Sequence, residues 1–416
     1  MRNLNKRVVV TGLGAITPLG ESVSEFWNGL VSGTSGVGPM TLADPSAYSC
    51  KISGEVSNFD PEKYIDKREA RRMSRFSQLA ISASSEALNA AGISYEKIDR
   101  TRMGVILGNG NGGYPDIEAA VRQIARGEGT RLSPFYFPMT LPNMAAANVS
   151  RLFGAEGVCS TVTTACAAST HAIGDAMTAI RNGIADVVIT GGAEAGISEL
   201  GLAGFCAMRA LTSRNDQPES ASRPFDLERD GFIPSEGAGI LILEEMEHAI
   251  SRGADIIVEL IGSGSSSDAF HQFQPDSTGA GAARAISLAI NDAGIQPDEI
   301  DYINAHGTST PLNDAIETNA IKSALGGSAN SVPISSTKSM IGHALGASGG
   351  MEAVACVKTI ETGIIHPTIN YSNPDPDCGL DYVPNIARDL PVSTVLSNSF
   401  GFGGQNSCVI FRAFEQ

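Results

Sequence analysis

The sequence lacks any hydrophobic run long enough to cross a membrane, since no stretch of about 18 consecutive apolar residues occurs in it. We also expect no signal peptide, because the first residues lead directly into a strand-like run at residues 7–11, without an apolar h-region or a cleavage site. The seven cysteines are odd in number and scattered, without Cys-x-x-Cys or a zinc-type Cys/His spacing. We therefore expect a cytoplasmic protein with reduced thiols, no metal site, no cofactor and no membrane partner.

Positive charge is also scarce, with 29 Lys and Arg against 45 Asp and Glu and a formal net charge of -16. A nucleic-acid partner would require a basic face that displaces phosphate counterions, so this balance argues against one. Residues 67–75 are the exception, with five positive charges and one negative. This stretch is either a solvated helix face or a docking patch for an acidic partner, and the residues by themselves favour the first.

The sequence contains an internal repeat. Residues 87–93, ALNAAGI, and residues 289–295, AINDAGI, each describe an amphipathic helix that ends at a glycine and leads into an apolar strand. We expect a duplicated α/β protein whose halves cover roughly residues 1–255 and 256–416, without a low-complexity linker between them.

Short apolar runs of the kind found in sheets covered on both faces supply the strand candidates. They are residues 7–11, 103–107, 187–190, 240–243, 300–305 and 409–411. Because helices of ordinary length fit between many of them, we expect a layered α/β/α/β/α architecture with mixed sheets.

Cys166 is the candidate nucleophile, because it lies where a strand-like run at residues 157–164 meets a helix of small residues. Free N–H groups and the positive end of the helix dipole favour a thiolate there. A dipole contribution of at most about 2 kcal/mol lowers a thiol pKa by only about 1.5 units from roughly 8.5. At neutral pH the thiol would still be largely protonated or only half ionised, so a nearby imidazole is needed.

His306 follows the expected strand at residues 300–305, and His343 closes a polar segment at residues 336–343. Ligands of α/β proteins gather beyond the carboxyl ends of strands, where both segments should lie. Either histidine alone is as well explained by a structural role, but their occurrence together with Cys166 favours a catalytic one. The glycine-rich loop at residues 398–406 either covers a pocket with its phenylalanines or is a tight turn before the last strand.

Four segments together resemble one family. Residues 164–166 (TAC), 304–310 (NAHGTST), 337–343 (TKSMIGH) and 398–406 (NSFGFGGQN) are similar to the β-ketoacyl-acyl-carrier-protein synthases, most closely the type II synthases. The similarity extends over the whole chain and includes residues 222–226 and 229–232. It implies a thiolase fold, usually a homodimer, and the decarboxylative condensation of an acyl thioester with malonyl-carrier protein in fatty acid elongation.

The resemblance also assigns roles to residues. Cys166 would carry the acyl group, and His306 and His343 would stabilise the enolate formed when the malonyl group loses carbon dioxide. The backbone N–H groups of Cys166 and Phe402 would form an oxyanion hole, with Phe402 as a gate. Lys338 and Glu352 match a charged pair behind the histidines, whose other explanation is a buried ion pair that orders the loop.

The partner implied by the resemblance is acyl-carrier protein, loaded with an acyl or a malonyl group. Its docking residues would be Arg68, Arg71, Arg72 and Arg209, and the acyl pocket would include Asn111, Tyr136 and Phe205. The type II enzymes commonly carry an apolar residue in place of Asn111 and phenylalanine in place of Tyr136. These departures leave open a shorter or more polar acyl group, as in a specialised polyketide or polyene ketosynthase.

Related enzymes fit less well. A thiolase would add a cysteine in Cys-x-Gly, which is missing, an initiating synthase would pair one histidine with an asparagine, and a chain-length partner would lack Cys166.

Gly12-Leu13-Gly14 lacks the third glycine of a dinucleotide site, and we interpret it as a tight strand-to-helix turn. Residues 346–350 match Gly-x-Ser-x-Gly by letter, but no expected strand precedes them. A pure binding module would keep its function after alkylation of Cys166.

Overall fold

The computed structural model describes residues 6–94 and 98–415. Residues 1–5, at the start of the segment expected to lack a signal peptide, lie outside the described residues. Within the described part of the chain, no helix is both long and apolar enough to cross a bilayer.

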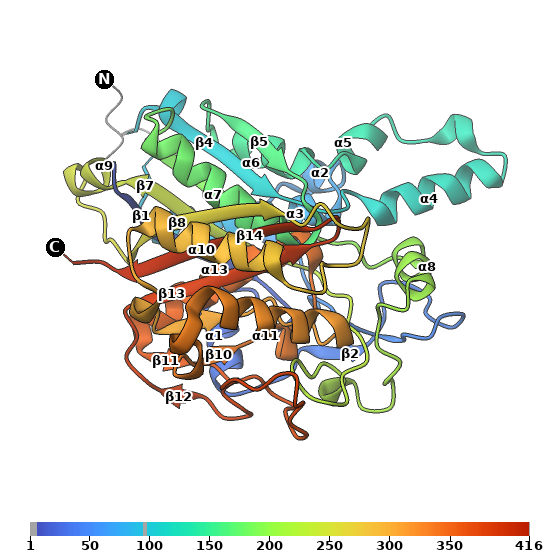
Figure 1. Ribbon diagram of the computed structural model, residues 1–416. Coiled ribbons are helices and arrows are strands. Elements are labelled where there is room, and N and C mark those ends of the chain that lie inside the picture. The colour runs from blue at the N-terminus through green and yellow to red at the C-terminus, as the bar shows by residue number, and fades with distance from the viewer. Residues whose placement is uncertain (1–5, 95–97, 416) are drawn as a thin grey trace.

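The strands form two five-stranded arrays with the same topology (Figure 1). The first contains β1 (Val8–Ile16), β4 (Met103–Gly108), β5 (Cys159–Val162), β6 (Val187–Glu194) and β7 (Gly237–Glu245). The second contains β8 (Val258–Ser267), β9 (Tyr302–Asn304), β10 (Ile334–Ser335), β13 (Thr394–Gly401) and β14 (Gln405–Ala413). Their orders, β1-β7-β6-β4-β5 and β8-β14-β13-β9-β10, correspond strand by strand, and the parallel and antiparallel pairings correspond as well.

The two arrays join where β1 pairs with β8, through Val9 with Glu259 and Val10 with Val258. The result is one mixed ten-stranded sheet. Every strand expected from the sequence overlaps an observed strand. The expected strand at residues 300–305 is shortened to β9, so His306 lies just beyond its carboxyl end.

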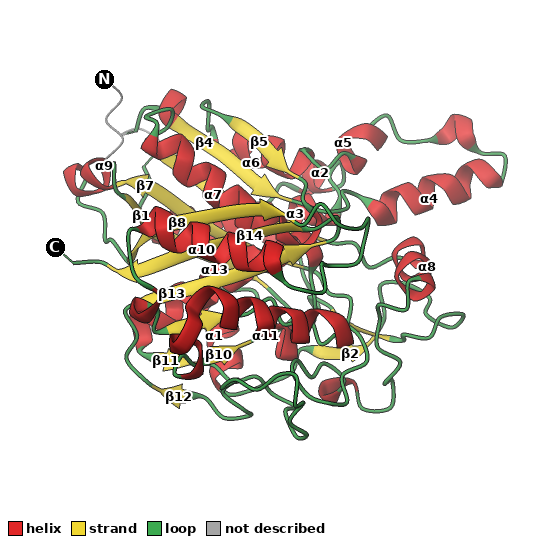
Figure 2. Cartoon of the chain, in the orientation of Figure 1, coloured by secondary structure: helices red, strands yellow, loops and turns green. Residues whose placement is uncertain are grey.

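Helices occupy three layers around the two arrays (Figure 2). The outer layers are α3 (Arg75–Ala90) with α6 (Met144–Phe153) on the first array, and α10 (Ala280–Ala293) with α11 (Pro311–Leu325) on the second. Between them, α7 (Ala168–Arg181) and α13 (Ser348–Thr362) contact strands of both arrays. The expected α/β/α/β/α layering is confirmed.

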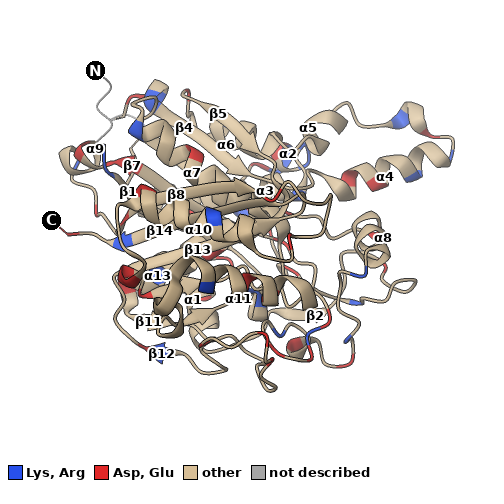
Figure 3. Cartoon of the chain, in the orientation of Figure 1, with Lys and Arg blue, Asp and Glu red and all other residues tan. Residues whose placement is uncertain are grey.

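The remaining elements are short or peripheral. They are α1 (Val23–Val31), β2 (Val37–Pro39), β3 (Ile52–Gly54), α2 (Lys67–Ala70), α4 (Tyr114–Ala125), α5 (Tyr136–Thr140), α8 (Glu199–Ala207), α9 (Met246–Ser251), α12 (Lys338–Ile341), β11 (Ile364–Ile365) and β12 (Arg388–Asp389). The segment that carries α4 and α5 projects from the body (Figure 1). Charged residues are distributed around the molecule, and the middle of the sheet is largely free of them (Figure 3).

The internal repeat is also a repeat of packing. A Cβ atom on Gly12 of β1 would lie 2.1 Å from the backbone oxygen of Ala87 on α3, and one on Gly262 of β8 would lie 2.5 Å from that of Ala289 on α10. Glycine on the strand therefore lets the covering helix approach closely in each half. The interpretation of residues 12–14 as a strand-to-helix turn was wrong, because they lie inside β1 beneath α3.

Candidate active site

Cys166 lies in a single helical turn, Ala165–Ala167, between β5 and the start of α7, and it is only 5 % exposed. Burial raises the pKa of its thiol to about 11, although the Lys338 charge and the backbone N–H groups of Phe402 and of Cys166 itself lower it. The expected preference for a thiolate at this helix end is therefore outweighed by desolvation. The resting nucleophile is a thiol, with two backbone N–H groups facing its sulfur.

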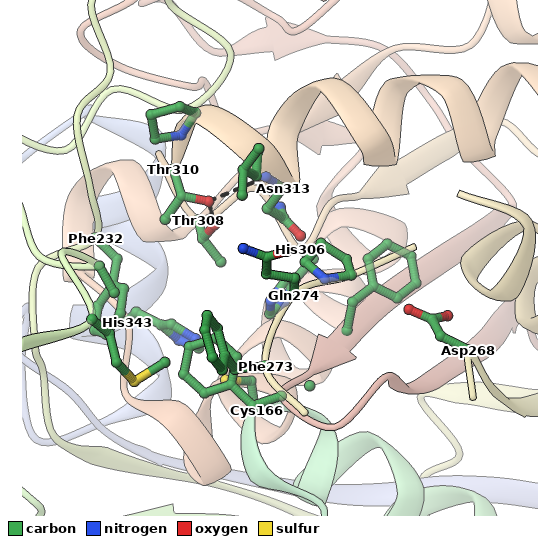
Figure 4. Close-up of a pocket in the computed structure, with 18 of the residues that line it drawn as sticks. Cys166, Phe232, Asp268, Phe273, Gln274, His306, Thr308, Thr310, Asn313 and His343 are labelled. Atoms are coloured by element: carbon green, nitrogen blue, oxygen red, sulfur yellow. Dashed lines mark hydrogen bonds between the residues drawn. The ribbon is translucent and has the colours of Figure 1, made fainter. Parts of the chain in front are cut away.

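His306 and His343 face one another beside Cys166 (Figure 4). Their ring centroids are 5.4 Å apart with the planes at 85°, and each residue is 2 % exposed. Burial and the Lys338 charge hold both pKa values well below the ordinary value for histidine. Both rings are therefore neutral at pH 7, and each carries one proton to donate.

The loop that carries His306 is held by a buried carboxylate. Glu317 on α11 accepts the backbone N–H groups of His306 and Gly307, each at 2.8 Å. Gly307 has a φ of +40°, a conformation that a glycine adopts readily. Glu317 therefore holds the turn that carries His306 beyond the end of β9.

The second histidine is held by a loop from the first half of the chain. The backbone N–H of His343 donates to the oxygen of Ile233 at 2.8 Å, and the ring of Phe232 stands edge-on to the imidazole at 5.2 Å. On the imidazole itself, Nδ1 lies 2.9 Å from the hydroxyl of Ser348. Segments from both halves thus build this part of the site.

Lys338 and Glu352 form an ion pair behind the histidines, and each is about 1 % exposed. Lys338 Nζ also donates to the backbone oxygen of His306 at 2.7 Å and lies 3.5 Å from its Nδ1. Burial raises the pKa of Glu352, while the Lys338 charge opposes that rise. The lysine charge is therefore directed at His306, consistent with the lowered pKa of that ring.

The glycine-rich segment at residues 398–406, expected to be a loop, forms most of a hairpin of two strands. β13 continues to Gly401 and β14 begins at Gln405, with Phe402 at the turn. A Cβ atom on Gly401 would lie 2.6 Å from the backbone oxygen of Thr164, so glycine lets the hairpin pack on the Cys166 turn. The segment is thus both a tight turn before the last strand and a cover over Cys166.

These residues surround a cavity of about 320 Å³. Its walls combine aromatic and aliphatic side chains with two threonines, Thr308 and Thr310, whose hydroxyls are 2.9 Å apart. Asp268, Phe273 and Gln274 line another part of it (Figure 4). A partly apolar cavity that ends at a thiol and two neutral imidazoles suits a thioester on a long, flexible carrier.

The expected acyl-pocket residues lie outside the lining of this cavity within the single chain. Phe205 packs at 5.2 Å from Phe232 and 6.3 Å from Phe402, both of which line it. Asn111 has a buried Nδ2 without a hydrogen-bond partner in the described part of the chain. Tyr136 begins α5 on the projecting segment, where its ring lies 5.2 Å from that of Phe137.

The expected docking arginines are all exposed, on two separate segments. Arg68, Arg71 and Arg72 lie on or just after α2, where Arg72 is 3.6 Å from Glu69 and stacks at 4.8 Å on the ring of Phe135. Arg209 follows α8 and lines the cavity. Within residues 6–94 and 98–415, no group of three or more His, Cys, Asp or Glu is arranged to hold a metal ion.

Sequence reasoning missed three supporting residues: Glu317, Glu194 and Ser348. Glu194 accepts the backbone N–H groups of Gly110 at 2.7 Å and Gly346 at 3.2 Å, and burial raises its pKa to about 7. Glu317 could have been found, because it lies on the same face of α11 as the buried Ile321. A charge on an apolar face indicates a buried partner.

Comparison with known proteins places the chain in a family. Models described as the beta-ketoacyl synthase N-terminal domain and C-terminal domain match residues 5–249 and 257–372. The chain belongs to the β-ketoacyl synthase family. This agrees with the thiolase fold expected from the sequence.

Full-length relatives are similarly informative. The chain is 49 % identical over 416 residues to the 3-oxoacyl-(acyl-carrier-protein) synthase 2 of Synechocystis sp., covering 100 % of both chains. It is 46 % identical over 411 residues to the enzyme of the same name from Staphylococcus aureus, covering 99 % of both. Among solved structures, a type II PKS ketosynthase in complex with its acyl-carrier protein and bound to the hexaketide superposes with a TM-score of 0.91 and 39 % identity, covering 98 % of this chain and 100 % of that one.

Proposed function

We propose that the protein joins an acyl group to a malonyl-derived unit, as the elongation step of fatty acid biosynthesis. Acyl-carrier protein and malonyl-carrier protein give 3-oxoacyl-carrier protein, free carrier protein and carbon dioxide. The observation that carries this proposal is the meeting of three buried residues, Cys166, His306 and His343, at one cavity, with both imidazoles neutral. The names of the full-length relatives support it.

The first step transfers the acyl group to Cys166. The sulfur attacks the thioester carbonyl, the bond to the carrier sulfur breaks, and the thiol proton of Cys166 ends on the departing carrier thiol. The negative charge that develops on the carbonyl oxygen needs fixed donors. The backbone N–H groups of Cys166 and Phe402 are suited to this role, since both already face the sulfur.

The second step breaks the bond between the malonyl carboxylate and its methylene carbon. Carbon dioxide leaves, and the electron pair becomes an enolate whose charge rests largely on the thioester oxygen. His306 and His343 donate hydrogen bonds to that oxygen. Their lowered pKa values are useful here, because neutral rings remain donors without holding the malonyl carboxylate as counter-ions.

The third step forms the new carbon–carbon bond. The enolate carbon attacks the acyl-Cys166 carbonyl, the carbon–sulfur bond breaks, and the released sulfur takes up one proton. The raised pKa of the Cys166 thiol favours that uptake. Lys338 and Glu352 support the cycle as positioning residues, with the Lys338 ammonium holding the backbone and the Nδ1 side of His306.

Carrier protein is the partner in this proposal. Its acidic surface would meet Arg68, Arg71, Arg72 and Arg209, all exposed, with Arg209 at the cavity itself. The solved ketosynthase with 39 % identity is in complex with its acyl-carrier protein, which supports the same kind of partner for this chain. We further propose a cytoplasmic homodimer, with the halves at residues 1–255 and 256–416 supplying the nucleophile and the histidines.

A specialised polyketide ketosynthase is the weaker alternative. The relatives named as 3-oxoacyl synthases are 49 % and 46 % identical to this chain, whereas the hexaketide-bound ketosynthase is 39 % identical. The unusual Asn111 and Tyr136 concern the choice of acyl group and leave the reaction unchanged.

The proposal is tested by incubating the purified protein with acyl- and malonyl-carrier protein and measuring 3-oxoacyl product and carbon dioxide together. The wild type should form both in equal amounts, and Cys166→Ser should form no condensation product. Normal product formation by Cys166→Ser, or none by the wild type with any acyl length, would overturn it.

A further inference from the structure

Among residues 6–94 and 98–415, the imidazole of His343 has one hydrogen-bond partner, the hydroxyl of Ser348. Its Nδ1 lies 2.9 Å from the hydroxyl oxygen of Ser348, and the two residues are 2 % and 1 % exposed. Within the described part of the chain, this is the sole hydrogen bond of the Ser348 side chain. The hydroxyl therefore has the ring nitrogen as its hydrogen-bond partner, and the ring nitrogen has the hydroxyl as its own.

Ser348 is not a helix cap, which is the usual reason for serine at the start of a helix. It is the first residue of α13, and the cap position is taken by Ala347, which makes no side-chain capping bond. The hydroxyl points instead at an imidazole that lines the cavity. The Ser348 hydroxyl therefore acts on the His343 ring and not on the helix end.

The need of the Ser348 hydroxyl proton for an acceptor decides the direction of this hydrogen bond. If Nδ1–H donated to Ser348, the serine hydroxyl proton would be buried without an acceptor, which is unfavourable. If the serine hydroxyl donates to Nδ1, both groups are satisfied, and the single ring proton lies on Nε2. Since His343 lines the cavity, Nε2 is the nitrogen left to face substrate.

We propose that Ser348 is a positioning residue that fixes His343 in the tautomer with its proton on Nε2, directed at the enolate oxygen. The proposal rests on the function given above for its catalytic meaning, but the tautomer itself is a property of the free protein. His306 reaches the same state by another route, because the Lys338 ammonium, which can only donate, lies 3.5 Å from its Nδ1. The site would thus present two Nε2–H donors to one oxygen.

The tautomer is read directly by NMR on free protein with ¹⁵N-labelled histidine rings, since protonated and unprotonated ring nitrogens resonate far apart. The chain has six histidines, and the loss of signals in His343→Ala assigns the relevant ring. We expect a protonated Nε2 in the wild type and in Ser348→Thr, which keeps the hydroxyl. In Ser348→Ala we expect a mixture of tautomers. A ring that stays protonated on Nε2 in Ser348→Ala would overturn the proposal.

Kinetics provide a second and separable readout. Ser348→Ala should slow malonyl decarboxylation on the order of tenfold, the loss of roughly one hydrogen bond. Acylation of Cys166 and the KM for malonyl-carrier protein should stay within about twofold, because ground-state binding does not use the bond. Equal losses in both half-reactions, or equal impairment of the Thr and Ala variants, would indicate a packing role and would contradict the proposal.

A matched control is Ser339→Ala, which removes another buried hydroxyl from the same region. The Ser339 hydroxyl donates to the backbone oxygen of Ser336 and accepts from the N–H of Ile369, and within the described residues it makes no hydrogen bond to either imidazole. It should leave the His343 tautomer and the ratio of the two half-reactions unchanged. A wild type that decarboxylates nothing yet shows the Nε2–H tautomer would contradict the proposed function and leave the Ser348 assignment standing.

Discussion

Lys338 forms an ion pair with Glu352, and its Nζ also donates a hydrogen bond to the backbone oxygen of His306 at 2.7 Å. Removing one member of a buried pair leaves the other charge uncompensated. The pair therefore affects both the stability of the fold and the state of the histidine.

Lys338→Met should destabilise the protein by about 3 to 5 kcal/mol, because Glu352 would remain buried without a partner. The double variant with Glu352→Met should recover part of that loss, since no buried charge remains. Neither variant should decarboxylate malonyl-carrier protein well, because both lose the ammonium beside His306. Urea unfolding measures the first effect, and a double variant less stable than Lys338→Met would contradict this explanation.

The exposed arginines should govern carrier binding and leave the chemistry unaffected. Changing Arg68, Arg71 or Arg209 to Glu should raise the KM for carrier protein, with kcat nearly unchanged, because an acidic partner would meet a negative charge. The effect should weaken as salt is added. Arg284→Glu, an exposed arginine on α10, is the matched control and should behave as the wild type. A reduced kcat with unchanged KM would exclude the docking role.

Asn111 should influence which acyl group is accepted. Its Nδ2 is buried and has no hydrogen-bond partner among the described residues, which disfavours a long apolar chain nearby unless the amide finds an acceptor. We expect Asn111→Ile to shift preference from shorter or more polar acyl groups toward longer apolar ones. Competition assays with carrier proteins of several acyl lengths test this, and an unchanged length profile would exclude Asn111 from the acyl pocket.

His366 should make the fold sensitive to acid. It is buried beside Tyr302 and Asn304, at 3.2 Å and 3.3 Å, and burial lowers its pKa from 6.5 to about 4. Below pH 6.5 the unfolded chain binds a proton that the folded chain does not, so stability falls as pH drops from 6.5 toward 4. At about 1.36 kcal/mol per pKa unit, the free energy of unfolding should fall by roughly 3 kcal/mol as the pH drops through this whole range.

The test compares wild type and His366→Gln by urea unfolding at neutral and acidic pH. The variant should be less stable than the wild type at neutral pH, and that difference should shrink as the pH falls from 6.5 toward 4, since only the wild type loses the contribution of this ring. His271→Gln, which replaces an exposed histidine, is the control for the substitution itself and should leave stability at neutral pH nearly unchanged. A constant difference for His366→Gln would contradict the account.

The strands and the nucleophile could be predicted from local patterns. Val187 to Thr190 is apolar and β-branched, which indicates a covered strand, and Cys166 follows a run of the same kind before small helical residues. The duplicated helices could be found because their glycine ends repeat. These features depend on neighbours in the sequence, which a single sequence displays.

The thiol pKa and the supporting residues could not be predicted in the same way. The pKa of Cys166 depends on how completely the Phe402 hairpin and the histidine loops bury it, and those segments lie far away in the sequence. Ser348 was matched only to a hydrolase-like pattern, because its relation to His343 depends on a turn of five residues. Gly12 and Gly14 were mistaken for a turn because the helix that requires them begins some sixty residues later.

The central claim is that Cys166 carries the growing chain and that the histidines act after it is loaded. Intact-protein and peptide mass spectrometry after incubation with acyl-carrier protein tests this most directly, using the wild type, Cys166→Ser and His343→Ala. We predict an acyl adduct on Cys166 in the wild type and in His343→Ala, although His343→Ala should no longer release carbon dioxide from malonyl-carrier protein. An adduct on any other residue, or full decarboxylation by His343→Ala, would contradict the account.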